Sequence, residues 1–290
     1  MTRHLGWLGF VLAVAARSAL GQAPADHNRF EARWPFDSDG SVRIVDPAGR
    51  IRVIGWDVDS LAVSGRGPGR LAAAGTVSVR KLVVTGRAEL EVHVPRGARV
   101  WVKSASADID VVGVDGTLDL NSVAGAIHVV GTPADVTAET MDGPVELAGG
   151  SGRARVKTVS GAILLRGASV DLGASTLSGT IVVRAAGWQR GGTGVQRGKF
   201  ESVTGDVRFD GELGRGGIVE LESQSGAIAL RVPATTVADF DLVTIAGSIT
   251  NRLTAATAER GVLRFSTGAE GGGAQVTARS FKGNISLDAK

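Results

Sequence analysis

The sequence predicts an all-β protein, folded as a single-stranded parallel β-helix: a right-handed solenoid with coils of about 18–21 residues. Nine times a Ser or Thr stands three residues before a small residue, and an alternating apolar strand follows. We call this small residue the pivot. The first five pivots are 18 residues apart, and such a short fixed period is typical of repeat architectures. The pivots are Ala107, Gly125, Gly143, Gly161, Gly179, Gly205, Gly226, Gly247 and Gly283.

Residues 1–21 have the pattern of a secretory signal peptide. Arg3 gives the positive start, Leu5 to Ala16 the apolar run, and Ala19-Leu20-Gly21 the cleavage site. This apolar run is shorter than the roughly 20 residues that span a bilayer. The sequence has no Cys, which excludes disulfides and a lipoprotein anchor. We therefore expect an exported mature protein, periplasmic, secreted or at the cell surface, without a transmembrane anchor.

Composition fits a thin aliphatic core and gives no sign of a nucleic-acid partner. Gly is enriched at 42 residues, while the chain has no Tyr, 5 Trp and 8 Phe. Of the 32 basic residues, two (Arg3 and Arg17) lie in the predicted signal peptide, which leaves 30 against 29 acidic residues. A charge near zero gives no electrostatic reason to bind nucleic acid.

The mature chain divides into three parts. Residues 22–40 are expected to be a leader, and residues 41–95 an N-terminal cap with irregular first coils, because a solenoid end exposes unpaired strand edges. Residues 96–290 carry the regular repeats, with a loop excursion at 185–199. At the other end, the charges of Leu287–Lys290 are expected to blunt the last edge only slightly.

Each repeat contains two strands that flank a corner. Alternate residues before the pivot, such as Leu118 and Leu120, and alternate residues after it are apolar, which predicts one buried and one solvated face. Stacked coils, flattened or triangular, would bury these residues against their equivalents above and below. A Gly pivot permits either a positive φ or a close backbone approach, and the Ser or Thr predicts a hydrogen-bond ladder at the corner. The inward pairs after the pivots are Ile109/Val111, Ile127/Val129, Val145/Leu147, Ile163/Leu165, Ile181/Val183, Val207/Phe209, Ile228/Leu230 and Ile285/Leu287.

This order of segments resembles a known family. SVRIVDPAGRIRVIGWDVDSLAVSG, then LEVHVPRGARVWVKSASADIDV, then repeated T-V-S-G-x-I-x-V units are similar to the bacterial β-strand-repeat family labelled "putative adhesin", a domain of unknown function. The likeness covers about Ser41 to Asp288. It implies an exported parallel β-helix and supplies no catalytic residues or cofactor. Ala107 in place of Gly, and Asn251 in place of an inward apolar residue, suggest local irregularity.

One column of outward residues contains candidate metal ligands. Asp110, His128 and Glu146 lie three residues after successive pivots, so an 18-residue register stacks them about 4.8 Å apart. Carboxylate, imidazole and carboxylate could hold a metal ion or a proton. The alternative is a solvated charge ladder, and the sequence commits to no metal site.

A second outward group is a candidate partner surface. Outward residues become apolar in the middle coils, with two arginines beside them, and the excursion at 185–199 follows directly. Grouped apolar and cationic residues mark contact surfaces. The alternative is that the excursion folds over the apolar pair as secondary core. The candidate residues are Leu164, Arg166, Val182, Arg184 and Trp188.

These features favour a non-catalytic, exported scaffold or adhesion-type binding module with an envelope or extracellular partner, either glycan or protein. Association through the solenoid edges stays open. The alternative is a carbohydrate-active enzyme, a polysaccharide lyase or hydrolase, since β-helices also carry such sites. Asp108, Asp110, Asp115 and Asp119 crowd the first repeats, but strand parity and turns are expected to scatter them.

Overall fold

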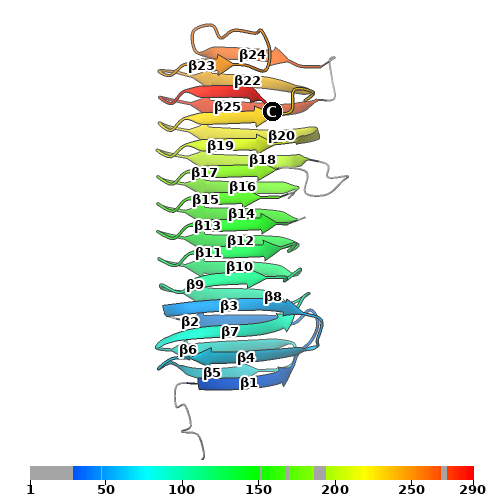
Figure 1. Ribbon diagram of the computed structural model, residues 1–290, viewed down its shortest axis with the longest axis vertical. Helices are drawn as coiled ribbons and strands as arrows, with labels where there is room; N and C mark the ends of the chain where they lie inside the picture. Colours follow the sequence, from blue (N-terminus) through cyan, green and yellow to red (C-terminus); the bar gives the residue numbers. More distant parts are fainter. Residues whose placement is uncertain (1–28, 47, 151, 168–169, 186–193, 269–272) are drawn as a thin grey trace, which may run out of the picture.

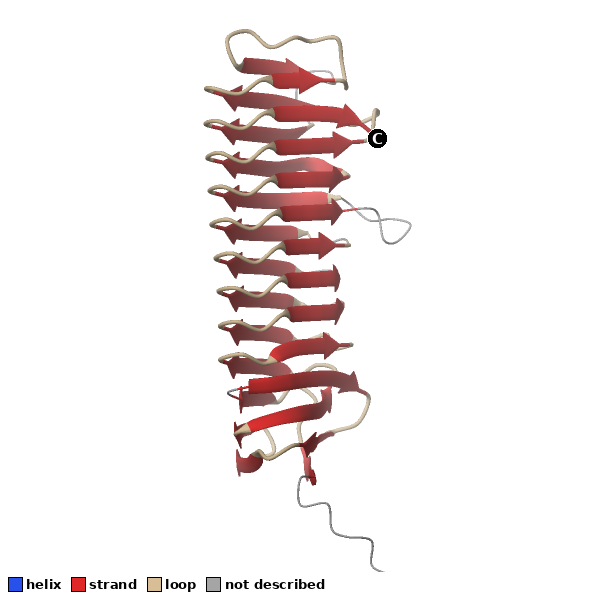
Figure 2. Cartoon of the chain, turned by 60° about the vertical axis from the view of Figure 1, so that its left-hand side comes forward, coloured by secondary structure: helices blue, strands red, loops and turns tan. Residues whose placement is uncertain are grey.

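The computed structural model describes residues 29–46, 48–150, 152–167, 170–185, 194–268 and 273–290. Within these ranges every regular element is a β-strand, and the strands form two sheets of 13 strands each. From β6 (Val79–Thr85) to β24 (Val262–Ser266) successive strands alternate between the sheets, which are the two walls of a long, flattened solenoid (Figures 1 and 2). The predicted all-β, parallel-rich architecture is confirmed, with two walls per coil. The predicted signal peptide lies outside the described residues.

The central coils follow one another in chain order. One wall, which we call wall A, contains β9 (Asp108–Val112), β11 (Ile127–Gly131), β13 (Val145–Gly149), β15 (Ile163–Arg166), β17 (Ile181–Ala185), β19 (Val207–Gly211) and β21 (Ile228–Val232). The facing wall B contains β8 (Arg99–Ser104), β10 (Thr117–Ser122), β12 (Asp135–Thr140), β14 (Arg153–Thr158), β16 (Asp171–Thr176), β18 (Val195–Ser202) and β20 (Leu213–Ser223).

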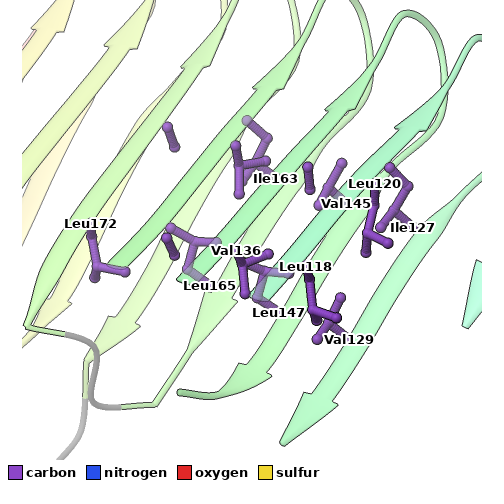
Figure 3. Packing of buried hydrophobic residues seen from close by; sticks show 14 of the residues in the cluster. Leu118, Leu120, Ile127, Val129, Val136, Val145, Leu147, Ile163, Leu165 and Leu172 are labelled. Carbon is purple, nitrogen blue, oxygen red and sulfur yellow. The ribbon is translucent and has the colours of Figure 1, made fainter. Parts of the chain in front are cut away.

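Equivalent residues stack along each wall. Ile163 of β15 pairs in parallel with Ile181 of β17, and Val156 of β14 pairs with Ala174 of β16. All four side chains are buried, as are all the predicted inward pairs. Figure 3 shows such side chains meeting between the two walls. The period-two alternation therefore fixes one continuous apolar core along the solenoid.

The corner before each wall A strand explains the hydroxyl and the small pivot. Thr158 Oγ1 accepts a hydrogen bond from Gly161 N at 3.0 Å and donates to Met141 O of the preceding coil at 3.1 Å. The corner hydroxyls thus bond the backbone, within a coil and between coils. A Cβ on Gly161 would lie 1.9 Å from Gly143 O. Close approach of backbones, one of the two expected reasons, therefore requires glycine here.

Near the N-terminus the stacking order departs from chain order. β2 (Ser41–Asp46) lies between β8 and β6 (Val79–Thr85), and β3 (Ala48–Trp56) lies between β9 and β7 (Arg87–Pro95). The coil of β2 and β3 is thus inserted beneath the first predicted repeat. It has a pivot, Gly49, but carries Asp46 where the repeats have Ser or Thr. This difference concealed a regular coil within the region expected to be irregular.

The C-terminus shows the same inversion. β26 (Ile285–Ala289) lies between β21 and β23 (Ile249–Asn251), and β25 (Ala274–Ser280) lies between β20 and β22 (Ala238–Thr244). In Figure 1 the C-terminus accordingly lies below β22 and β24. The expectation that Leu287–Lys290 forms the last edge was wrong, because the final strand is paired on both sides.

Antiparallel strands cover both ends. β1 (Arg29–Pro35) pairs with β4 (Ser60–Arg66), β4 pairs with β7, and β5 (Arg70–Gly75) pairs with β6. At the other end β24 (Val262–Ser266) pairs with β22. The expected leader 22–40 therefore includes a strand, since β1 begins at Arg29. Similarly, β18 already begins at Val195, so the excursion expected at 185–199 is shorter.

Candidate binding surfaces

The residues proposed as metal ligands form a column on wall A. His128 of β11 pairs with Asp110 on one side and Glu146 on the other, as the register predicted. His128 Nδ1 lies 3.8 Å from Asp110 Oδ1. Each carboxylate also faces an arginine: Asp110 Oδ2 lies 3.9 Å from Arg50 Nε, and Glu146 Oε1 lies 3.4 Å from Arg166 Nε.

This arrangement is a charge ladder. Arg52 stands between Glu91 and Asp110 in the same column, so cationic and anionic side chains alternate through several coils. Across the described ranges, no three His, Cys, Asp or Glu side chains are grouped so that they could hold a metal ion. Exposed pairs of this kind contribute about 0–1 kcal/mol each.

The predicted partner surface assembles in part on wall A. Leu164 of β15 pairs with Val182 of β17, and Arg166 pairs with Arg184. The two apolar side chains are partly exposed and the two arginines are exposed. We call these four residues the central patch. Trp188, the fifth candidate, lies outside the described residues.

Wall B carries a hollow, lined by charged residues of both signs, that the sequence analysis did not identify. It has a volume of about 340 Å³. Gly173 of β16 forms its floor, and Arg155 crosses this position to place Nη2 2.8 Å from Asp171 Oδ1. Lys199 Nζ lies 2.7 Å from Glu201 Oε1, a bond that raises the lysine pKa. The signal in the sequence was a glycine at an outward strand position.

A second missed feature is an apolar ridge along the corner. The residue two before each pivot projects outward, and it is apolar in most coils; the turns lie at the left edge of Figure 1. Met141 and Leu177 are each 51% exposed, and Ile245 is 71% exposed. Backbone bonds such as Val159 N to Met141 O tie neighbouring members together. In stacking order this corner ridge comprises Ala105, Val123, Met141, Val159, Leu177, Val203, Gln224, Phe281 and Ile245.

A groove of about 670 Å³ runs beside the corner ridge on its wall B side. Ser175, Glu201, Glu222 and Arg279 line one flank, and ridge residues such as Phe281 line the other. This groove is about twice the volume of the hollow on wall B.

The acidic residues weighed for catalysis have partners within the chain, and they lie on both walls and in a turn. Asp108 Oδ1 on wall A accepts from Ala126 N at 3.0 Å, and Asp115 Oδ1 in a turn accepts from Thr132 Oγ1 at 3.1 Å. Asp119, on wall B, bonds Asn121 at 2.6 Å. The expected scattering holds only in part, because Asp108 and Asp110 share the outward face of β9 and both lie within 4.0 Å of Arg50.

Comparison with known proteins identifies the family. A protein-family model described as Toastrack DUF4097 matches residues 72–288, and the chain belongs to this family of unknown function. The family expected from the repeated units is thereby confirmed. No curated protein resembles the sequence closely enough to count as a match.

Solved structures give weaker likenesses. A "putative cell adhesion protein" from Clostridium sporogenes is 9% identical, with 91% of this chain and 100% of that one covered and a TM-score of 0.26. A "putative adhesin" from Bacteroides fragilis is 8% identical, with 90% of this chain and 97% of that one covered and a TM-score of 0.42. A "putative lipid binding protein" from Parabacteroides distasonis is 11% identical, with 90% of this chain and 97% of that one covered and a TM-score of 0.32. At such TM-scores these likenesses carry no argument.

One negative finding concerns membranes. In the ranges that the structure describes, no helix is long and apolar enough to cross a bilayer.

Proposed function

We propose that this protein is a non-catalytic binding module, exported to the envelope or beyond, which presents an adhesion or scaffold surface on a rigid solenoid. The central patch is the observation that carries this proposal. Leu164 and Val182 lie side by side on paired strands, and Arg166 and Arg184 continue the same two strands. Strands fixed by pairing on both sides hold the backbone of such a surface in place, so binding has no backbone ordering cost.

The charge of the central patch suggests the partner. Two adjacent guanidinium groups favour an anionic ligand, and the neighbouring apolar pair favours a face with apolar character. Arg166 is partly compensated by Glu146, while Arg184 lies in register with Asp210 on its other side. An acidic glycan of the envelope, or an acidic protein surface, fits this chemistry.

The test is capture from the envelope of the source cell by the mature protein, followed by a glycan array. We expect Arg166→Glu with Arg184→Glu to abolish the specific capture, and Trp188→Ala to weaken it. The matched control is Arg153→Glu with Arg197→Glu, which makes the same charge change on wall B. Equal capture by both double variants would exclude the central patch.

The same material tests the enzymatic alternative. Bound envelope polysaccharide should be recovered without new reducing ends and without unsaturated products after prolonged incubation. New reducing ends would show that the protein is a hydrolase, and unsaturated products would show that it is a lyase; either result would contradict the proposed non-catalytic role.

Export and winding are part of the proposal. Cleavage after residue 21 would give a mature chain beginning at Gln22, which mass spectrometry of the extracytoplasmic protein would test. Right-handed coils of about 18–21 residues are the hand and length favoured for parallel crossovers in this repeat. A crystal structure with left-handed coils would contradict this inference.

A further inference from the structure

The corner ridge is an apolar feature outside the core, with most of its members exposed. From Val123 to Ile245 it extends through eight stacked coils, about 34 Å at about 4.8 Å per coil. Soluble monomers seldom expose so many contiguous apolar side chains, and patches of this kind mark contact surfaces. Its members contribute little to their own coil, because the core is formed by the inward residues.

The wall B flank of the ridge is charged in an uneven pattern. The column nearest the ridge pairs Glu139 with Lys157, Glu201 with Glu222, and Glu222 with Arg279 in successive coils. Glu201 and Glu222 are therefore adjacent, with Lys157 two coils before Glu201 and Arg279 directly after Glu222, while Glu139 lies on the other side of Lys157. In stacking order the column is Lys103, Asn121, Glu139, Lys157, Ser175, Glu201, Glu222, Arg279 and Val243.

We propose that a second copy of this chain docks on the corner ridge in the antiparallel sense, forming a two-fold symmetric dimer. The two-fold axis is perpendicular to the long axis of the solenoid and parallel to the line that joins wall A to wall B. The wall B flanks of the two copies then face each other and run in opposite directions. A two-fold interface requires one surface to be complementary to itself. The flanking charges show whether any register satisfies this requirement.

One register does. With the axis between the coils of Leu177 and Val203, each ridge residue meets a residue on the other side of the axis. The charged flank then sets Lys157 opposite Glu222 and Glu139 opposite Arg279. The ridge pairs are Leu177 with Val203, Val159 with Gln224, Met141 with Phe281, and Val123 with Ile245.

Charged residues on the wall A side of the ridge independently favour the same register. The residue directly before each pivot is Asp142 in one coil and Lys282 in another. In this same register Asp142 lies opposite Lys282. Within one chain Asp142 Oδ1 accepts a hydrogen bond from Ser160 Oγ at 2.9 Å, and the neighbours of both residues in their column carry no charge.

Other registers bring like charges together. A shift of one coil in one direction places Glu139 opposite Glu222, and in the other direction it places Lys157 opposite Arg279. A parallel dimer sets Glu139 opposite Asp142 and Arg279 opposite Lys282. Like charges facing each other suppress the wrong pairing, so the flanks specify a single arrangement.

The groove beside the ridge fits this arrangement. In the chosen register Met141 of the second copy lies at the coil of Phe281, over the groove of about 670 Å³. A strip about 34 Å long and roughly 15 Å wide buries roughly 500 Å² per copy, near the lower limit of specific interfaces. We therefore expect a reversible dimer whose population depends on concentration. The contact runs along the solenoid and not through its ends.

Sedimentation equilibrium between about 1 and 200 µM, on the protein without its predicted signal segment, tests the dimer. We expect a monomer–dimer equilibrium, and at least a tenfold rise in its dissociation constant for Leu177→Lys. Val130→Lys is the matched control, because Val130 is also exposed but lies on wall A. Thermal unfolding of each variant checks that the fold is intact.

A charge exchange tests the register. Asp142→Lys and Lys282→Asp should each weaken the dimer, and the two together should restore it. A monomer over the whole range, or a dimer that neither Leu177→Lys nor the exchange affects, would overturn the proposal. Binding of a monomeric protein to phosphatidylcholine–phosphatidylglycerol vesicles, lost in Leu177→Lys, would assign the ridge to lipid and overturn it as well.

Discussion

Asp46 lies directly beside Ser104 in the column of corner residues, in paired strands of adjacent coils. The carboxylate is completely buried and takes the place that a hydroxyl occupies in the nine repeats. Its Oδ1 accepts a hydrogen bond from Ala48 N at 3.1 Å, while Oδ2 is buried without a partner in the described part of the chain. The coil of β2 and β3 therefore contains a costly charge where the repeats have a neutral hydroxyl.

The first prediction concerns this charge. Burial raises the pKa of Asp46 from 3.8 to about 6, against the weaker opposite effect of the Ala48 hydrogen bond. Because the folded state holds the proton more tightly, stability falls as pH rises from about 4 to 6, and the full cost remains at pH 7. Asp46→Ser should raise the free energy of unfolding at pH 7 on the order of 2 kcal/mol.

Urea unfolding at pH 4 and pH 7 measures this effect. The variant should lose most of its advantage at pH 4, where the native carboxyl is protonated in the folded state. An equal difference between variant and native protein at both pH values would show that ionisation of Asp46 is not the cause.

The second prediction concerns the pivot. Gly161→Ala brings a Cβ to 1.9 Å from Gly143 O and 2.8 Å from Thr158 Oγ1, so two coils must separate. We expect a loss of about 2–3 kcal/mol, as for other overpacked sites. Ala162→Val, one residue further on and exposed, should be tolerated. Similar urea midpoints for the two variants would mean that the coils yield at the corner.

The third prediction concerns the two faces of a strand. Ile181→Asp places an unpaired carboxylate in the core, which should cost more than about 4 kcal/mol and unfold adjoining coils. Val182→Asp changes the neighbouring, partly exposed residue and should cost far less. Thermal melts followed by circular dichroism compare them. Equal melting temperatures would refute the assignment of faces.

The alternation that places Ile181 inside was predictable because side chains of a strand alternate with a period of two. The repeat also gave the register of His128 with Asp110 and Glu146. Arg50, which balances Asp110, was not predictable as a neighbour, because it arrives from a coil inserted out of chain order. No local pattern records which coil stacks on which.

The candidate surfaces differ in the same way. Leu164 and Val182 were predicted together because one 18-residue step relates them. The corner ridge was visible in the same motif, where Val159 and Leu177 stand two residues before their pivots. The exposure of these residues could not be inferred, because an apolar residue at a corner is as compatible with burial as with exposure. The corner points outward because the hydroxyl and pivot beside it occupy the inner side.

The last prediction follows from the inserted C-terminal coil. Leu287 lies three residues from the end of the chain, where substitutions are usually tolerated. Here β26 pairs with β21 on one side and β23 on the other, and Leu287 is fully buried. Leu287→Asp should therefore destabilise the protein about as much as Ile181→Asp. It should also free β22–β24 from the coils before them, because β25 and β26 are the layer between.

Limited proteolysis and hydrogen exchange can locate this effect. Leu287→Asp should give rapid exchange and cleavage across residues 238–290, with the coils from β8 to β19 still protected. Ser286→Asp, a change on the outward neighbour in the same strand, is the control and should leave protection unchanged. Protection of β22 and β23 in the Leu287→Asp protein would mean that these strands pack without the inserted coil.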